Sequence, residues 1–164
     1  MRCILQDMRH LAWLALSPLL LTGCMAPEAT STATISVGPD AVLASVSATG
    51  GLCPDAACGS VFTVHGDGTW TQTGGQVDQG GTLSAQTLTY LVEATASTTI
   101  LSAPAFTGTC PIAYDGVELV YAWTSPDGQS HEVSSCDKAI PPDDPLVVAL
   151  AAVEAQQAPA NSVG

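Results

Sequence analysis

One stretch, residues 60–73, decides the fold; it reads Ser60-Val61-Phe62-Thr63-Val64-His65-Gly66-Asp67-Gly68-Thr69-Trp70-Thr71-Gln72-Thr73. Two runs rich in β-branched and aromatic residues flank Asp67-Gly68. Asp-Gly between two such runs is a strong short-range signal for a tight hairpin turn. The stretch therefore predicts two antiparallel strands, 60–65 and 69–73, joined at residues 66–68.

The segments on either side of this hairpin differ in character. Residues 41–49 alternate β-branched and small side chains up to Gly50-Gly51, which predicts another strand. Residues 74–81 contain only glycine, glutamine, valine and aspartate. They lack the lysine and hydroxyl residue of a phosphate-binding loop, so we interpret them as a connector.

Residues 82–97 have the spacing of an amphipathic helix. Their apolar face follows the i, i+3, i+4, i+7 pattern at Leu88, Leu91, Val92 and Thr95. Ser84 is suited to cap the N-terminus of this helix.

A second hairpin is predicted over residues 117–135. Residues 117–124 alternate in a way that places Tyr121 and Trp123 on one face, and residues 131–135 return as the partner strand. Between them, Ser125-Pro126-Asp127-Gly128 has the residues of a type I turn.

A second helix is predicted over residues 145–157. Asp143 or Asp144 caps it and Pro145 takes its first position, where a missing N–H costs nothing. Its apolar stripe consists of Leu146, Leu150 and Val153.

These elements together predict an α+β domain over residues 41–157, with a small antiparallel sheet, two helices on one face (ββαββα-like) and two disulfides. The alternative is a β-sandwich in which residues 82–97 are not helical. Residues 158–164 are interpreted as a frayed tail.

The N-terminus carries an export signal. A largely apolar run of eleven residues, 11–21, follows Arg9 and His10. It is shorter than the roughly 20 residues of a bilayer span, and its length is typical of a secretory signal. The run ends in Leu21-Thr22-Gly23-Cys24.

This order of residues resembles the lipobox of bacterial lipoproteins. The resemblance implies that residues 1–23 are a signal peptide, that the Cys24 sulfur carries a diacylglycerol, and that residues 24–40 are a flexible tether from the membrane. Met25 rather than aspartate after the cysteine implies the outer membrane in a bacterium that has two membranes. Translation starts at Met1 or Met8, and the alternative reading is an ordinary secretory signal with a chance cysteine.

The cysteines follow from this topology. Of six, Cys3 leaves with the signal and Cys24 is lipidated. The other four lie outside the cytoplasm, where disulfides are expected. Three pairings are open, and we favour Cys53–Cys58 with Cys110–Cys136 because each joins neighbours in the predicted layout. A four-cysteine zinc site is disfavoured, because zinc-binding cysteines usually come in close pairs.

The charge excludes one class of function. Without residues 1–23 the chain keeps Lys138 as its only lysine or arginine, against 14 carboxylates, since Arg2, Arg9 and Asp7 leave with the signal. Nucleic acid binding needs clustered cations. We therefore exclude nucleic acid as a partner, whereas a basic partner or simple solubility fits this charge.

No pattern for a cofactor, a metal or catalysis stands out. His65 with Asp67, and His131 in the second hairpin, are interpreted as strand and turn residues. Asp137, Asp143 and Asp144 could bind calcium, but a helix cap already explains the last two. The candidate recognition residues are Trp70, Asp67, Tyr121 and Trp123. Core packing is the default for the last two, and Trp70 is expected to be the more exposed aromatic.

Two segments of the domain show further resemblances. Gly50-Gly51-Leu52-Cys53 through Trp70 is similar to a group of uncharacterised bacterial domains, which implies no function. Asp115-Gly116 through Cys136 resembles the end of a subtilisin-inhibitor-type domain, but the reactive-site region of that family has no counterpart here.

The sequence thus predicts a non-enzymatic, lipid-anchored module of the bacterial cell envelope. Its partner is the membrane, through Cys24, and an extracytoplasmic protein or polysaccharide. The alternative function is inhibition of secreted proteases through the tips at Asp67-Gly68 or Pro126-Asp127-Gly128.

Overall fold

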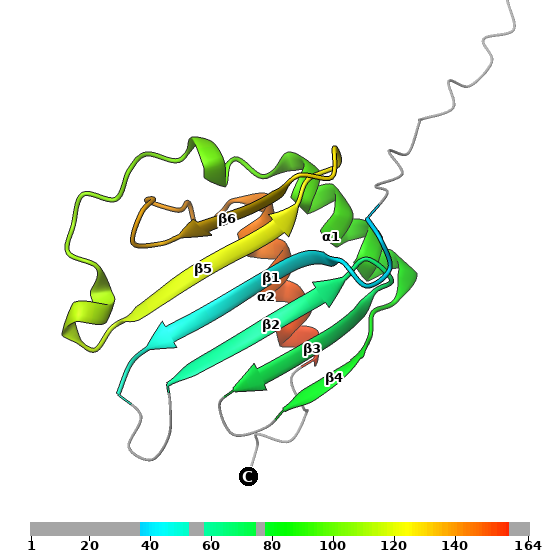
Figure 1. The fold of residues 1–164 in the computed structure, drawn as a ribbon, viewed down its shortest axis with the longest axis horizontal. Coiled ribbons are helices and arrows are strands. Elements are labelled where there is room, and N and C mark those ends of the chain that lie inside the picture. The colour runs from blue at the N-terminus through cyan, green and yellow to red at the C-terminus, as the bar shows by residue number, and fades with distance from the viewer. Residues whose placement is uncertain (1–36, 53–57, 75–77, 158–164) are drawn as a thin grey trace, which may run out of the picture. The chain divides into compact units, whose positions relative to one another are not determined.

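The structure, a computed structural model, describes residues 37–52, 58–74 and 78–157 (Figure 1). Its strands and α-helices in chain order are β1 Val42–Gly50, β2 Gly59–His65, β3 Thr69–Gly74, β4 Gln79–Thr82, α1 Ala85–Ser97, β5 Val117–Thr124, β6 Ser130–Ser134 and α2 Pro145–Gln157. Two short 3₁₀ turns, Ile100–Ser102 and Pro111–Tyr114, lie between α1 and β5. In these ranges no helix has the length and apolar character needed to cross a membrane.

The described strands form one antiparallel sheet in the order β4-β3-β2-β1-β5-β6. The predicted hairpin of residues 60–73 is confirmed as β2 and β3, with Val64 opposite Trp70. Its turn requires Gly68, whose φ of 83° lies in the left-handed region that glycine adopts without strain. The second predicted hairpin is confirmed as β5 and β6, with Trp123 opposite His131.

Both α-helices lie against the same face of the sheet (Figure 1). Because side chains alternate along each strand, buried apolar residues gather on that face. They are Ala44, Phe62, Val64, Trp70, Tyr121, Trp123 and Val133. They form one core with Leu91 of α1 and Leu150 of α2. The predicted α+β class is confirmed, and the alternative β-sandwich is wrong because residues 85–97 are helical.

Both helices begin where the capping residues predicted. Ser84 Oγ accepts a hydrogen bond from Thr87 N–H (3.1 Å) at the start of α1. At the start of α2, Asp144 Oδ1 accepts one from Leu146 N–H (2.9 Å), and Pro145 takes the first helical position. Of the two aspartates considered as the cap, the structure selects Asp144.

Two expectations from the sequence are wrong. The glycine-rich connector includes a strand, β4, which pairs with β3 at the edge of the sheet. Trp70 is not exposed: only 6% of its surface is accessible, because its register opposite Val64 turns it toward the helices. Its indole N–H is buried and has no hydrogen-bond partner among the described residues. Leaving this N–H without a partner costs about 1–3 kcal/mol. Burial of the apolar indole ring, which also packs on Phe62, offsets this cost.

One of the two favoured disulfides, Cys110–Cys136, is present, with its Cα atoms 5.0 Å apart. It joins the segment after α1 to the end of β6. Cys53 lies outside the described residues, so the Cys53–Cys58 pairing stays a prediction. Val37, the first described residue, already packs against the core.

Candidate functional site

A cavity of about 550 Å³ lies between β5, residues 135–142 and the start of α2. Its wall is mainly apolar and consists of Phe106, Leu119, Ile140, the pair Pro141-Pro142 and Val147. Tyr121, Ser135, Lys138 and Ala139 complete the lining. We call this cavity the Lys138 pocket. Its volume falls within the range of about 300–1,000 Å³ that small-molecule sites occupy.

The wall that β5 contributes follows from the alternation of side chains along this strand. Leu119 and Tyr121 alternate onto the helix-covered face of the sheet, opposite Ala48 and Val46 of β1. The pair Pro141-Pro142 cannot extend the sheet, since proline has no N–H to donate. The chain has already left the sheet at Ser134, where β6 ends, and Ser135 with residues 138–142 forms one wall of the pocket.

Backbone hydrogen bonds hold the rim of the pocket in place. Phe106 N–H donates to Asp137 O (2.9 Å), and Ala139 N–H donates to Pro104 O (2.9 Å). The Cys110–Cys136 disulfide covalently links the same two segments a few residues away. The rim is thus fixed both by hydrogen bonds and by a covalent bond.

Two polar groups in the lining have unused hydrogen-bonding capacity. Lys138 Nζ donates to Ala103 O (3.0 Å), and no described carboxylate forms an ion pair with it. The Tyr121 hydroxyl makes no hydrogen bond to any described residue. Burial, and then the negative charges of Asp144 and Glu154, raise the pKa of Tyr121 above its usual value. Its hydroxyl therefore stays protonated and able to donate.

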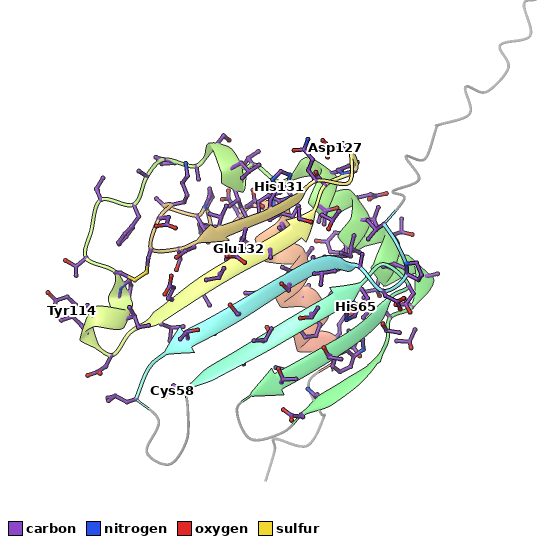
Figure 2. The ribbon with its side chains drawn as sticks, viewed as in Figure 1. Cys58, His65, Tyr114, Asp127, His131 and Glu132 are labelled. Carbon is purple, nitrogen blue, oxygen red and sulfur yellow. A yellow bond between two sulfur atoms is a disulfide. The ribbon has the colours of Figure 1, made fainter. Side chains whose placement is uncertain are left out.

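The second hairpin tip brings Ser125 together with Asp127 and His131, and Figure 2 labels the last two. Ser125 Oγ donates to Asp127 Oδ1 and lies 3.0 Å from His131 Nε2. The hydrogen bond from Ser125 lowers the pKa of Asp127. In a hydrolase triad the aspartate instead holds the second ring nitrogen of the histidine. Here the serine proton is directed to Asp127, so the network stabilises the turn.

The first tip behaves in the same way. Asp67 accepts hydrogen bonds from Thr69 N–H (2.8 Å) and the Thr69 hydroxyl (2.7 Å), and the hydroxyl bond is the main cause of its lowered pKa. His65 Nδ1 lies instead 3.2 Å from Asp40 O. The described structure therefore holds no hydrogen bond between His65 and Asp67.

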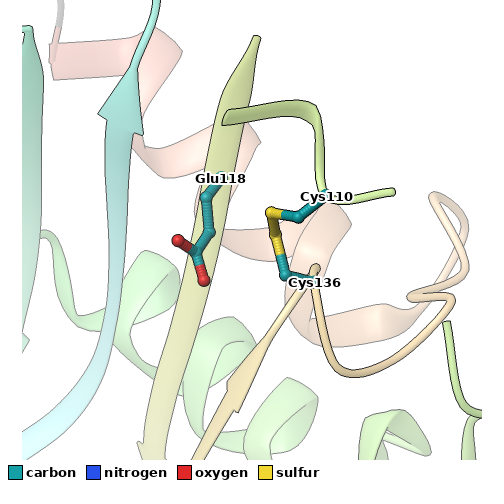
Figure 3. A group of neighbouring side chains, drawn as sticks. All are labelled: Cys110, Glu118 and Cys136. Carbon is teal, nitrogen blue, oxygen red and sulfur yellow. A yellow bond between two sulfur atoms is a disulfide. The ribbon is translucent and has the colours of Figure 1, made fainter. Parts of the chain in front are cut away.

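One group of potential metal ligands is found among the described residues: Cys110, Glu118 and Cys136 (Figure 3). The two sulfurs are bonded to each other, so neither is available as a thiolate, and Glu118 accepts a hydrogen bond from the Ser134 hydroxyl. Zinc coordination by these cysteines is therefore incompatible with the structure.

The aspartates considered for calcium are not grouped either. Among the described residues, Asp137, Asp143 and Asp144 do not form a ligand cluster. Both oxygens of Asp144 accept hydrogen bonds from Thr98, Thr99 and Leu146.

The four predicted recognition residues lie apart. Trp123 is buried and packs on His131, with ring centroids 5.1 Å apart, while Trp70 is buried in the core. Asp67 is exposed at a hairpin tip. Tyr121 alone lines the pocket. The sequence reasoning did not assign a site role to Lys138, although its being the only cation downstream of residue 23 was a usable signal.

Comparison of the chain with protein-family models, with curated proteins and with solved structures found no match.

Proposed function

We propose that this chain is a lipid-anchored protein of the bacterial envelope whose domain binds a small apolar ligand in the Lys138 pocket without transforming it. The main support for this proposal is the pocket, which has a volume of about 550 Å³, a mainly apolar wall and a few polar groups. Ligand sites in proteins have this composition.

Three further features support the proposal. Leu21-Thr22-Gly23-Cys24 provides the anchor through its resemblance to a lipobox. The Cys110–Cys136 disulfide fits an oxidising compartment outside the cytoplasm. The backbone hydrogen bonds of the rim form without a ligand. This preorganisation lowers the conformational entropy that the rim would lose when a ligand binds.

The hairpin tips, which a protease inhibitor would use, offer less. They are tight turns, and the side chains of Asp67 and Asp127 are bound to residues of their own turns. Neither tip presents an extended segment to a protease cleft.

The pocket is tested with N-phenyl-1-naphthylamine, a neutral dye that fluoresces in apolar surroundings. Every described core residue lies between Val37 and Val153, so the fragment of residues 33–164 is used. Ala139→Phe places a ring in the pocket and keeps the backbone bond to Pro104. We expect wild type to bind one dye and Ala139→Phe to bind at least about tenfold more weakly.

The matched control is Ala151→Phe, which adds the same ring to an exposed position of α2 away from the pocket. It should bind the dye as wild type does. Absence of dye binding by wild type, or equal losses in the two variants, would contradict the proposed pocket.

The anchor is tested in the full chain expressed in a diderm bacterium with radiolabelled palmitate. We expect label in the wild-type protein and its recovery with the outer membrane. Cys24→Ser removes the sulfur that the resemblance assigns to lipid attachment, so it should carry no label. A labelled Cys24→Ser protein, or an unlabelled wild type, would refute the anchor.

A further inference from the structure

Lys138, the only lysine or arginine of residues 24–164, has an unusual position for a cation in an acidic domain. Residues 24–164 carry 14 carboxylates and no other lysine or arginine. A lone ammonium in such a chain would be expected to pair with a carboxylate. Instead Lys138 pairs with no described carboxylate and lines an apolar cavity.

Lys138 lines the pocket, and one hydrogen bond fixes the position of its ammonium. Of its three N–H donors, one is directed to Ala103 O at 3.0 Å. Ala103 directly precedes residues 104–106, whose backbone is hydrogen-bonded to residues 137–139. The carbonyl that accepts from Lys138 therefore belongs to the rim of the pocket. The other two donors make no hydrogen bond to a described residue.

The net charge of the domain bears on which ligand charge the pocket favours. The net negative charge disfavours an anion over most of the surface. In the pocket, the Lys138 charge acts next to an apolar wall, where the local dielectric constant is lower and electrostatic attraction is stronger than in water. An anion is thus favoured where a hydrocarbon chain is also favoured.

We infer that the ligand of the Lys138 pocket is an amphiphile, a single hydrocarbon chain that ends in a carboxylate, whose head group pairs with the Lys138 ammonium. The inference rests on the proposed function and names its ligand class. Tyr121, whose hydroxyl makes no hydrogen bond to any described residue, lines the same pocket. The chain then lies against Phe106, Leu119 and Ile140.

The test is displacement of N-phenyl-1-naphthylamine from residues 33–164 by decanoate, 1-decanol and decyltrimethylammonium, each below its micelle concentration. The three compounds share a ten-carbon chain and differ in the charge of the head group. A charge-assisted hydrogen bond contributes about 1.5–3 kcal/mol. We therefore expect decanoate to compete about tenfold to hundredfold better than decanol, and the ammonium compound to compete least.

Two substitutions assign the preference to Lys138. Lys138→Met keeps an unbranched apolar side chain without the charge and should bring decanoate to the level of decanol. Lys138→Arg keeps the charge and should retain most of the preference. Circular dichroism and the dye affinity show whether each variant keeps its fold and pocket, and the wild-type ligand series stands even if one does not.

The outcomes separate the two proposals. If the dye binds but decanol competes as well as decanoate, or if Lys138→Met keeps the preference, the ligand assignment is overturned while the apolar pocket stands. If neither the dye nor any of the three compounds binds wild type, the pocket itself is refuted.

Discussion

Asp144→Asn is expected to lower the free energy of unfolding by about 3 kcal/mol, and Asp143→Asn by less than about 0.5 kcal/mol. The Asp144 carboxylate is buried and accepts hydrogen bonds from the Thr98 hydroxyl (2.8 Å), Thr99 N–H (2.8 Å), the Thr99 hydroxyl (3.0 Å) and Leu146 N–H (2.9 Å). It thereby joins the end of α1 to the start of α2. An asparagine would direct its NH₂ group at one set of these donors.

The same network makes this contribution depend on pH. Burial raises the pKa of Asp144, but the hydrogen bonds from Thr99, Thr98 and Leu146 outweigh it, and the pKa lies below the usual 3.8. A carboxyl whose pKa is lowered by folding stabilises the protein above its unfolded pKa. That stability is lost as the pH falls through the folded value.

Urea unfolding at pH 7 and pH 3 measures both effects. The difference between wild type and Asp144→Asn should narrow at pH 3, whereas Asp143→Asn, altered at an exposed neighbour, should follow wild type at both values. An Asp144→Asn loss no greater than that of Asp143→Asn would contradict the assigned network.

Replacing both cysteines in Cys110→Ser/Cys136→Ser is expected to cost about 3.5 kcal/mol, the chain-entropy value for a separation of 26 residues. It should also weaken dye binding, because Cys136 follows the pocket residue Ser135 and Cys110 follows the segment that carries Phe106. Chemical unfolding and dye titration of residues 33–164 measure the two effects.

The control is Cys53→Ser/Cys58→Ser. The shorter loop between these cysteines predicts a smaller loss, about 2 kcal/mol, and Cys58, the described member of the pair, is not among the pocket-lining residues. If the Cys110→Ser/Cys136→Ser protein stays within about 1 kcal/mol of wild type and binds the dye unchanged, the disulfide does not hold the rim.

Local signals in the sequence were sufficient for most of the fold. The Asp67-Gly68 turn and the caps at Ser84 and Asp144 act over a few residues, and each structure appears where it was predicted. The strand β4 was missed because its glycines carry no side-chain pattern. Trp70 was misjudged because its orientation depends on the register set by the turn, which composition does not reveal.

The pocket could not be predicted because no single segment builds it. Phe106, Leu119 and Ile140 come from three parts of the chain, and only the tertiary fold brings them to one pocket. The sequence identifies Tyr121 as a recognition candidate because it is aromatic, and gives no sign that it lines a cavity. The sequence shows that Lys138 is the only lysine or arginine after residue 23. Only the fold shows that it lines an apolar pocket and forms no ion pair with a described carboxylate.

The most direct test of the central claim is a titration of ¹⁵N-labelled residues 33–164 with decanoate, followed through backbone amide shifts. The account predicts saturable shifts at Leu119, Tyr121 and residues 135–140, with one affinity throughout and little change at the hairpin tips 66–68 and 126–128. Shifts confined to the tips, or no saturable shifts at all, would contradict it.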